Sequence, residues 1–248
     1  MKKRLLILGG TGDATELATR ASQIANLEVV SSLAGRTKQP STPTGTLRIG
    51  GFGGVGGLGE YLTDRAIDLL IDATHPFAAQ ISMNAATAAA EFQLPHLMLV
   101  RPAWTPVQGD RWIEVENHEE AAMALSERSQ RVFLTIGRQE LTAFSSLDSI
   151  WFLIRAIEPP ALGILYPQSQ LILAKGPFFL ENERELLLKY QIDTIVSKNS
   201  GGDATYAKIV AARELGIPVV MVQRPPIPDA EVVTDVEGAI AWLKKHLN

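Results

Sequence analysis

The sequence predicts an α/β protein of two domains, each built on a mainly parallel sheet, because strand-like and helix-like segments alternate along its 248 residues. Short aliphatic runs such as residues 4–9 have the composition of buried strands, and segments with a helical period of apolar residues follow most of them. The stretch Pro102–Asp110, with two prolines and a glycine, separates the first series from the second. We therefore expect a first domain over residues 1–105 and a second over residues 106–248.

Each domain is expected to contain several strand–helix units. In the first, strands are expected near residues 4–9, 27–33, 46–50, 68–73 and 96–101, with helices near 13–24, 57–66 and 77–91. In the second, strands are expected near residues 112–115, 131–136, 150–155, 171–175, 193–197 and 218–222, with helices near 117–129, 180–190, 203–215 and 235–246. Since ligands of open parallel sheets bind outside the carboxyl ends of the strands, the residues that follow each strand are the first candidates for function.

The composition excludes several classes of protein. A formal net charge of −4 argues against a nucleic-acid-binding protein, which usually carries a basic excess. The absence of cysteine excludes disulfides, thiolate chemistry and cysteine-ligated metals, and no histidine pair or carboxylate cluster has metal-ligand spacing, so we expect no protein-bound metal. The apolar run after the basic Met1–Arg4 is too short for a signal peptide, and no run of 18 apolar residues could span a membrane. We expect a cytoplasmic protein.

The first strand leads into a glycine turn and then a helix. Read as G-x-G-x-x-G from Gly10, the segment has Thr15 in place of the third glycine. The N–H groups at the start of such a helix can bind phosphate, and the first βα turn is where dinucleotide-binding domains place that site. Any strand–turn–helix of an α/β protein would also explain the segment. The candidate cofactor-binding residues are Gly9, Gly10, Thr11 and Gly12.

Two further segments bear on the cofactor. Dinucleotide folds that bind NAD usually carry an acid at the end of the second strand, whereas Ser31–Lys38 contains none and offers Arg36 and Thr37 instead. A guanidinium binds phosphate in a bidentate manner, so NADPH is expected and NADH stays possible. The glycine run Gly50–Gly59 follows the third strand and permits close approach of the backbone to a ligand at Gly51, although a flexible connection would have the same composition.

The fourth strand ends with Asp72, Thr74 and His75, followed by Pro76 at the expected first position of a helix. By the strand-end rule these three side chains lie near the reactive end of a bound cofactor. His75 could equally be a helix cap or an ordinary loop histidine.

Six cations stand at the carboxyl ends of six predicted strands. They are Arg101, Arg138, Arg155, Lys175, Lys198 and Arg224. Gathered on one rim of an acidic protein, they would form a basic pocket for a substrate with several negative charges. The turns after Lys175 and Lys198, the second of which contains Ser200 and Gly201, lead into helix N-termini that can bind carboxylates. We expect this rim to face the dinucleotide site across a cleft between the domains.

Motifs along nearly the whole chain resemble those of the precorrin-6A reductase family, which includes cobalt-precorrin-6A reductases. The segments that carry the resemblance are Ile7–Thr11, Leu33–Thr37, Gly50–Gly54, Asp72–Ala78, Lys175–Phe178, Lys198–Gly202 and Leu215–Pro225. The resemblance implies two Rossmann-like domains with the cofactor in the cleft between them. It also implies reduction of a C=C bond of a tetrapyrrole polycarboxylate by hydride from NADPH in cobalamin biosynthesis.

Hydride addition to this substrate requires positioning of the cofactor and delivery of a proton. Lys198 and His75 are the candidates to steer that charge, with Asp72 orienting a partner. The residues expected to bind the carboxylate arms of the substrate are Arg101, Arg138, Arg155, Lys175, Ser200, Gly201 and Arg224.

Two rival interpretations differ in class. A short-chain dehydrogenase would need Tyr-x-x-x-Lys, and none of the four tyrosines has a lysine four residues later. A non-catalytic NADPH-binding sensor would keep the first domain but has no need of the cations of the second. It stays open, as does another NADP-dependent reductase of an anionic substrate.

Overall fold

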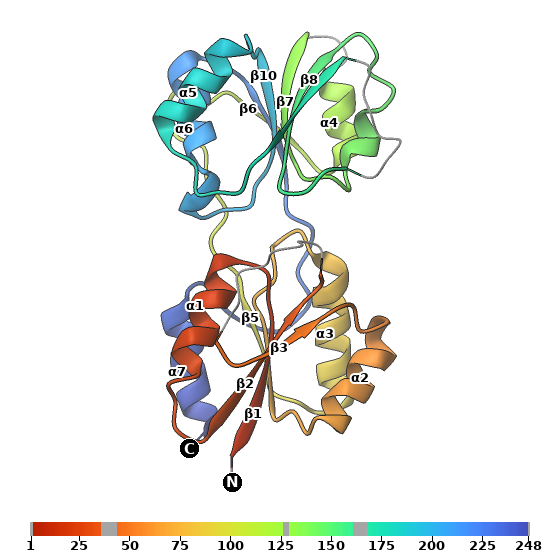
Figure 1. Cartoon of the computed structure of the whole chain (residues 1–248), viewed down its shortest axis with the longest axis vertical. Coiled ribbons are helices and arrows are strands. Elements are labelled where there is room, and N and C mark those ends of the chain that lie inside the picture. The colour runs from red at the N-terminus through yellow and green to blue at the C-terminus, as the bar shows by residue number, and fades with distance from the viewer. Residues whose placement is uncertain (1, 36–43, 126–128, 161–167, 248) are drawn as a thin grey trace. The chain divides into compact units, whose positions relative to one another are not determined.

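The computed structural model describes residues 2–35, 44–125, 129–160 and 168–247 and divides the chain into two compact units (Figure 1). The first unit combines Met1–Pro102 with Pro225–Asn248, and the second is Ala103–Arg224. The predicted junction at residue 105 is therefore close to the first crossing of the chain. The assignment of residues 225–248 to the second domain is wrong, because this segment returns to the first unit.

The first unit is a parallel sheet with helices on both faces. Its strand order is β12-β5-β4-β1-β2-β3. The strands are β1 (Lys3–Leu8), β2 (Leu27–Leu33), β3 (Thr46–Ile49), β4 (Leu69–Asp72), β5 (His96–Leu99) and β12 (Glu231–Val233), and the helices are α1 (Gly12–Ala21), α2 (Gly54–Asp64), α3 (Ala79–Glu91) and α7 (Val236–Leu247).

Alternation along β1 explains the two layers of core. Leu5 and Ile7 belong to the cluster beneath α1 and α7, whereas Leu6 and Leu8 belong to the cluster beneath α2 and α3. All four side chains are almost fully buried, so this strand is covered on both faces, as central strands of parallel sheets are. Figure 1 shows α1 and α7 side by side on one face of this sheet.

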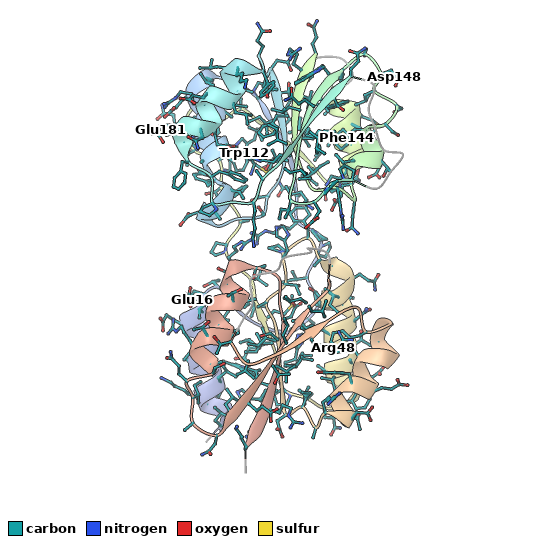
Figure 2. The ribbon with its side chains drawn as sticks, viewed as in Figure 1. Glu16, Arg48, Trp112, Phe144, Asp148 and Glu181 are labelled. Atoms are coloured by element: carbon teal, nitrogen blue, oxygen red, sulfur yellow. The ribbon has the colours of Figure 1, made fainter. Side chains whose placement is uncertain are left out.

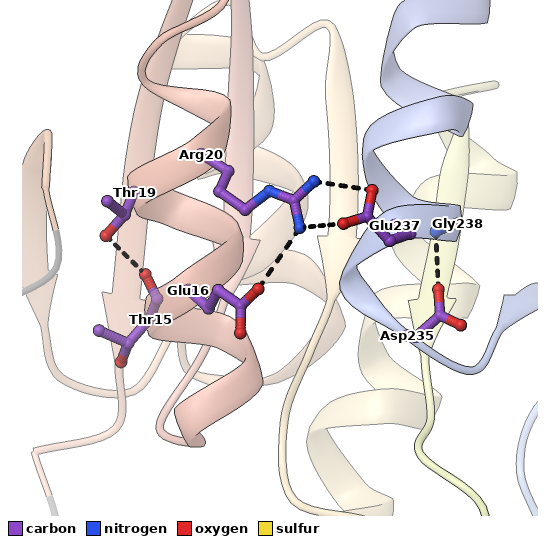
Figure 3. Close-up of polar contacts among 7 residues, drawn as sticks. All are labelled: Thr15, Glu16, Thr19, Arg20, Asp235, Glu237 and Gly238. Carbon is purple, nitrogen blue, oxygen red and sulfur yellow. Dashed lines mark hydrogen bonds and ion pairs between the residues drawn. The ribbon is translucent and has the colours of Figure 1, made fainter.

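The C-terminal segment is held in the first unit by both polar and apolar contacts. β12 adds to the sheet edge by pairing in parallel with β5, and Trp242 and Leu243 of α7 lie in the same core cluster as α1. The guanidinium of Arg20 on α1 donates to both carboxylate oxygens of Glu237 on α7, at 2.6 and 2.8 Å (Figure 3). The Asp235 carboxylate accepts from the N–H of Gly238, which caps the start of α7.

The second unit is also a parallel sheet between helices, in the order β6-β11-β10-β7-β8-β9. Its strands are β6 (Trp112–Val115), β7 (Arg131–Thr135), β8 (Trp151–Ala156), β9 (Ser169–Leu173), β10 (Thr194–Lys198) and β11 (Val219–Val222). Its helices are α4 (His118–Leu125), α5 (Leu180–Lys189) and α6 (Ala207–Leu215), with 3-10 turns η1 (Leu141–Phe144) and η2 (Asp203–Thr205). One core face packs Phe133 and Met221 under α5 and α6. On the other face lies the buried Phe144, which Figure 2 labels. Its ring centroid is 6.4 Å from that of Phe152.

Three predicted helix starts differ from the structure. The helix expected from residue 203 begins, as α6, at Ala207 after the 3-10 turn η2. α2 begins at Gly54 rather than near residue 57, so the glycine run forms its first turn, and α3 begins at Ala79, which leaves Pro76 in the preceding turn. Packing explains a glycine at position 57, because a Cβ there would overlap the carbonyl oxygen of Phe52. Across the described residues, no helix is both long and apolar enough to cross a membrane.

Candidate functional site

In the first unit, Thr11 connects the glycine turn to the end of β4. It is the N-cap of α1, where its hydroxyl accepts from the N–H of Ala14 at 3.0 Å and donates to the carbonyl of Ala73 at 2.8 Å. The neighbouring Gly10 has a φ of +118°, which favours glycine. The first N–H groups of α1 have no acceptor within the helix and can bind a phosphate. The strand order reverses between β1 and β4, which is where doubly wound sheets bind ligands.

The end of β4 carries the second group of predicted residues. Asp72 is 2% exposed, and its Oδ1 accepts from the N–H of Thr74 at 2.9 Å and from the Thr74 hydroxyl at 2.6 Å. The Nδ1 atom of His75 accepts from the N–H of Phe77 at 3.2 Å, which positions the ring. All three predicted residues line one hollow that is partly open to solvent.

The structure brings Arg101 to the same unit. Its guanidinium donates to the carboxylate of Asp13, in the first turn of α1, at 3.0 Å. This contact places Arg101 beside the predicted phosphate site. The predicted Arg36 and Thr37 lie outside the described residues.

Arg48 is a residue that the sequence reasoning missed. Its guanidinium donates to the carbonyl oxygens of Gly50 and Gly51, at 2.5 and 2.9 Å, and lies 3.7 Å from the ring centroid of Phe52. It therefore holds the glycine run in a defined turn that leaves Gly51 exposed. The sequence signal that could have identified it is a cation in the strand directly before a glycine run.

In the second unit, Lys198 ends β10 and its ammonium lies 2.9 Å from the carboxylate of Glu140. Gly137 lies beside the pair, because a Cβ there would be 3.3 Å from Glu140 Oε2 and 3.9 Å from Lys198 Nζ. His118, at the start of α4, is electrostatically close to both groups. Burial and the positive charge of Lys198 lower the pKa of this imidazole. Neither Glu140 nor His118 is predicted from the sequence.

Asn199 organises the turn that follows Lys198. Its side chain is buried and makes two hydrogen bonds to the backbone of Trp104, from the Trp104 N–H at 2.8 Å and to the Trp104 carbonyl at 3.0 Å. Its own carbonyl accepts from the guanidinium of Arg224 at 2.8 Å. The predicted Ser200 and Gly201 are buried in this turn, so their side chains and Cα atoms lie inside it rather than on its surface.

Arg155 is not a rim cation, and its assignment to substrate binding is wrong. It is 8% exposed, and its guanidinium makes two hydrogen bonds to the Glu183 carboxylate, at 2.5 and 3.0 Å. It also lies 3.7 Å from the ring centroid of Phe178. The side chain points into the layer between β8 and α5. There the Glu183 carboxylate pairs with its charge, and the Phe178 ring covers one face of the guanidinium.

A second buried cation lies near this pair. Lys208, on α6, is 3% exposed, donates to the carbonyl of Thr205 at 2.9 Å and lies 5.0 Å from the ring of Trp104. Burial, followed by the positive charge of Arg155, lowers the pKa of Lys208 to about 7. The other predicted cations of the unit are more accessible: Lys175 is exposed after β9, and the half-buried Arg138 donates to the carbonyl of Pro159 at 3.2 Å.

Known proteins match this chain across both units. The family described as precorrin-6x reductase CbiJ/CobK matches residues 4–244. A curated precorrin-6A reductase of Rhodococcus erythropolis is 51% identical over 241 residues, covering 97% of each chain. A cobalt-precorrin-6A reductase of Priestia megaterium is 28% identical, over 95% of this chain and 96% of its own. The solved structure titled CobK precorrin-6A reductase superposes with a TM-score of 0.93 at 42% identity, covering 98% of this chain and 97% of its own. This chain belongs to the precorrin-6x reductase family.

Proposed function

We propose that this protein reduces one C=C bond of precorrin-6A with hydride from NADPH, giving precorrin-6B for cobalamin biosynthesis. The observation that carries the proposal is the full-length match to the precorrin-6x reductase family, together with a dinucleotide-type switch point in the first unit. The cobalt-free substrate is favoured because the relative named for it shares 51% identity, against 28% for the one named for the cobalt form. The cytoplasmic location stays a prediction.

The first unit is the proposed cofactor domain. Gly9–Gly12 and the start of α1 would hold the pyrophosphate, because backbone N–H groups at a helix N-terminus bind anions. Thr74 and His75 would flank the nicotinamide at the end of β4. Arg36 and Thr37 stay the predicted ligands of the 2′-phosphate, and Gly51 stays a predicted backbone contact. The bound cofactor supplies the hydride.

The second unit is the proposed substrate domain. Lys175, Arg138 and Arg224 stand at or after strand ends and would bind carboxylate arms, since guanidinium and ammonium groups form charge-assisted hydrogen bonds to carboxylates. Arg101 is proposed for the same role, although its contact with Asp13 also suits the cofactor phosphates. Ser200 and Gly201 are proposed to shape the turn that presents these groups.

Lys198 is the proposed source of the proton that accompanies hydride transfer. The Glu140 carboxylate at 2.9 Å holds the ammonium in place, and the absence of a side chain at Gly137 avoids a close contact with that carboxylate. His75 is the second candidate, and Asp72 fixes the backbone of Thr74 next to it. A well-placed general acid contributes about 10²–10⁴-fold to a rate.

The test uses the purified chain with precorrin-6A and NADPH, followed by loss of absorbance at 340 nm and by the mass of the product. We expect turnover with NADPH, slower turnover with NADH, and slower turnover with the cobalt-loaded substrate. Lys198→Met is expected to lower kcat about 100-fold or more, whereas the matched Lys175→Met raises the KM for precorrin-6A with little change in kcat. Cofactor binding without turnover on either tetrapyrrole would instead indicate the sensor.

A further inference from the structure

We propose that Asp72 Oδ2 accepts a hydrogen bond from the carboxamide NH2 of the nicotinamide ring and so fixes the ring at the end of β4. This inference rests on the proposed function, because it requires that the first unit binds NADPH.

The carboxylate of Asp72 is satisfied on one side only. Oδ1 receives both donors of Thr74, whereas Oδ2 is fully buried and has no hydrogen-bond partner among the described residues. An unsatisfied buried acceptor is costly, and more so when it is charged. Burial lowers the pKa of the neighbouring His96, and the Asp72 carboxylate offsets part of this shift. A donor brought by a ligand would relieve this cost.

The hollow that Asp72 lines has a mostly apolar wall. Met98, Leu99 and Val100 line it from the end of β5, and Pro226 and Ile227 line it from the segment that returns from the second unit. The other titratable group on its wall is His75, whose Nδ1 already accepts from a backbone N–H. Within this apolar lining, Asp72 Oδ2 is an acceptor that no described donor occupies.

The position of Asp72 relative to the glycine turn favours the nicotinamide end of the cofactor. β4 pairs with β1, with Leu8 opposite Asp72, and Thr11 binds the carbonyl of Ala73. A pyrophosphate at the start of α1 would therefore lie next to the turn that contains Asp72. The nicotinamide carboxamide offers an N–H donor at the edge of an apolar ring, which matches one unpaired acceptor in an apolar hollow. An N–H of the tetrapyrrole is the competing donor, and the experiment separates the two.

The experiment measures binding of three oxidised cofactors by calorimetry, with no tetrapyrrole present. NADP⁺ and its thionicotinamide analogue carry the NH2 group, whereas the 3-acetylpyridine analogue has a methyl group in its place. We expect the wild-type protein to bind the acetylpyridine analogue about tenfold to a hundredfold more weakly than the other two, the usual effect of a hydrogen bond to a charged group. The Asp72→Asn variant replaces Oδ2 by a donor, so the difference is expected to disappear.

Thr87→Ala is the control, because Thr87 is exposed on α3 outside the hollow and should leave the discrimination unchanged. Equal affinity of the wild-type protein for all three cofactors would overturn the inference, and this arm does not depend on whether Asp72→Asn folds. If Asp72→Asn folds and keeps the discrimination, the inference is also wrong. Failure of the wild-type protein to bind NADP⁺ at all would overturn the proposed function as well.

Discussion

Replacing Lys208 by methionine is expected to stabilise the second unit, although the substitution removes a hydrogen bond. Lys208 is 3% exposed and lies beside the Arg155–Glu183 pair, so two buried cations share one carboxylate. Its ammonium donates to one backbone carbonyl, at 2.9 Å. Methionine has a similar length, fills irregular apolar space and brings no charge, so the balanced pair would remain.

The magnitude follows from the pKa of this lysine. Burial lowers it from 10.5 to about 7, and each pH unit corresponds to about 1.4 kcal/mol. The unfolded chain therefore binds more protons than the folded chain between pH 7 and 10.5, and stability rises with pH across that window. The cost of the wild-type ammonium is about 4 kcal/mol at pH 7 and about 2 kcal/mol at pH 9. After about 1 kcal/mol for the lost hydrogen bond, Lys208→Met should gain about 3 kcal/mol at pH 7.

Urea unfolding at pH 7 and pH 9 checks both the sign and the window. Three of the four tryptophans, Trp104, Trp112 and Trp151, lie in the second unit, so their fluorescence reports mainly on its unfolding. The exposed Lys189→Met is the control and should leave the pH dependence as it is in the wild-type protein. A Lys208→Met variant that is less stable at pH 7, or whose advantage does not shrink by pH 9, would refute the reasoning.

Two further substitutions test the packing that holds the motif segments. Arg155→Met should destabilise the second unit by about 3–5 kcal/mol, because it leaves the buried Glu183 carboxylate without its two hydrogen bonds from the guanidinium. Adding Glu183→Gln should restore part of the loss, as measured by urea unfolding. A neutral single variant would contradict the buried pair. Gly57→Ala should lower the Tm of the first unit by several degrees, because its Cβ would overlap the carbonyl of Phe52, whereas Gly56→Ala, with open space around its Cβ, should not. Equal thermal shifts for the two glycine variants would contradict this packing.

Local patterns predicted most of the fold. Aliphatic runs such as Leu5–Leu8 form buried strands because helices cover both faces of the sheet. A central strand of a parallel sheet therefore has apolar residues at consecutive positions, which is a pattern visible in the sequence. The return of residues 225–248 was beyond such patterns. The helix and strand of this segment have the same local sequence pattern as those of either unit. Long-range contacts, such as that of Arg20 with Glu237, decide which unit they join.

The candidate site shows the same division. Thr11 was predicted as a site residue because it belongs to the glycine turn after the first strand, which is a local feature. The structure adds its hydrogen bond to Ala73, which is 62 residues away. Arg155 was misassigned because a cation at a strand end has the same sequence signature whether it meets solvent or a buried carboxylate. The partner, Glu183, is 28 residues further along and is indistinguishable in sequence from the exposed acids of the same helix.

Motif residues of the second unit act mainly by fixing backbone. Phe178 donates its N–H to the carbonyl of Ala204 at 3.0 Å and stacks on Arg155, so the turn after Lys175 is bonded to the turn after Lys198. Asn199 in turn binds the backbone of Trp104. Two turns bonded in this way have little conformational freedom left to lose, which would lower the entropic cost of binding the proposed substrate there.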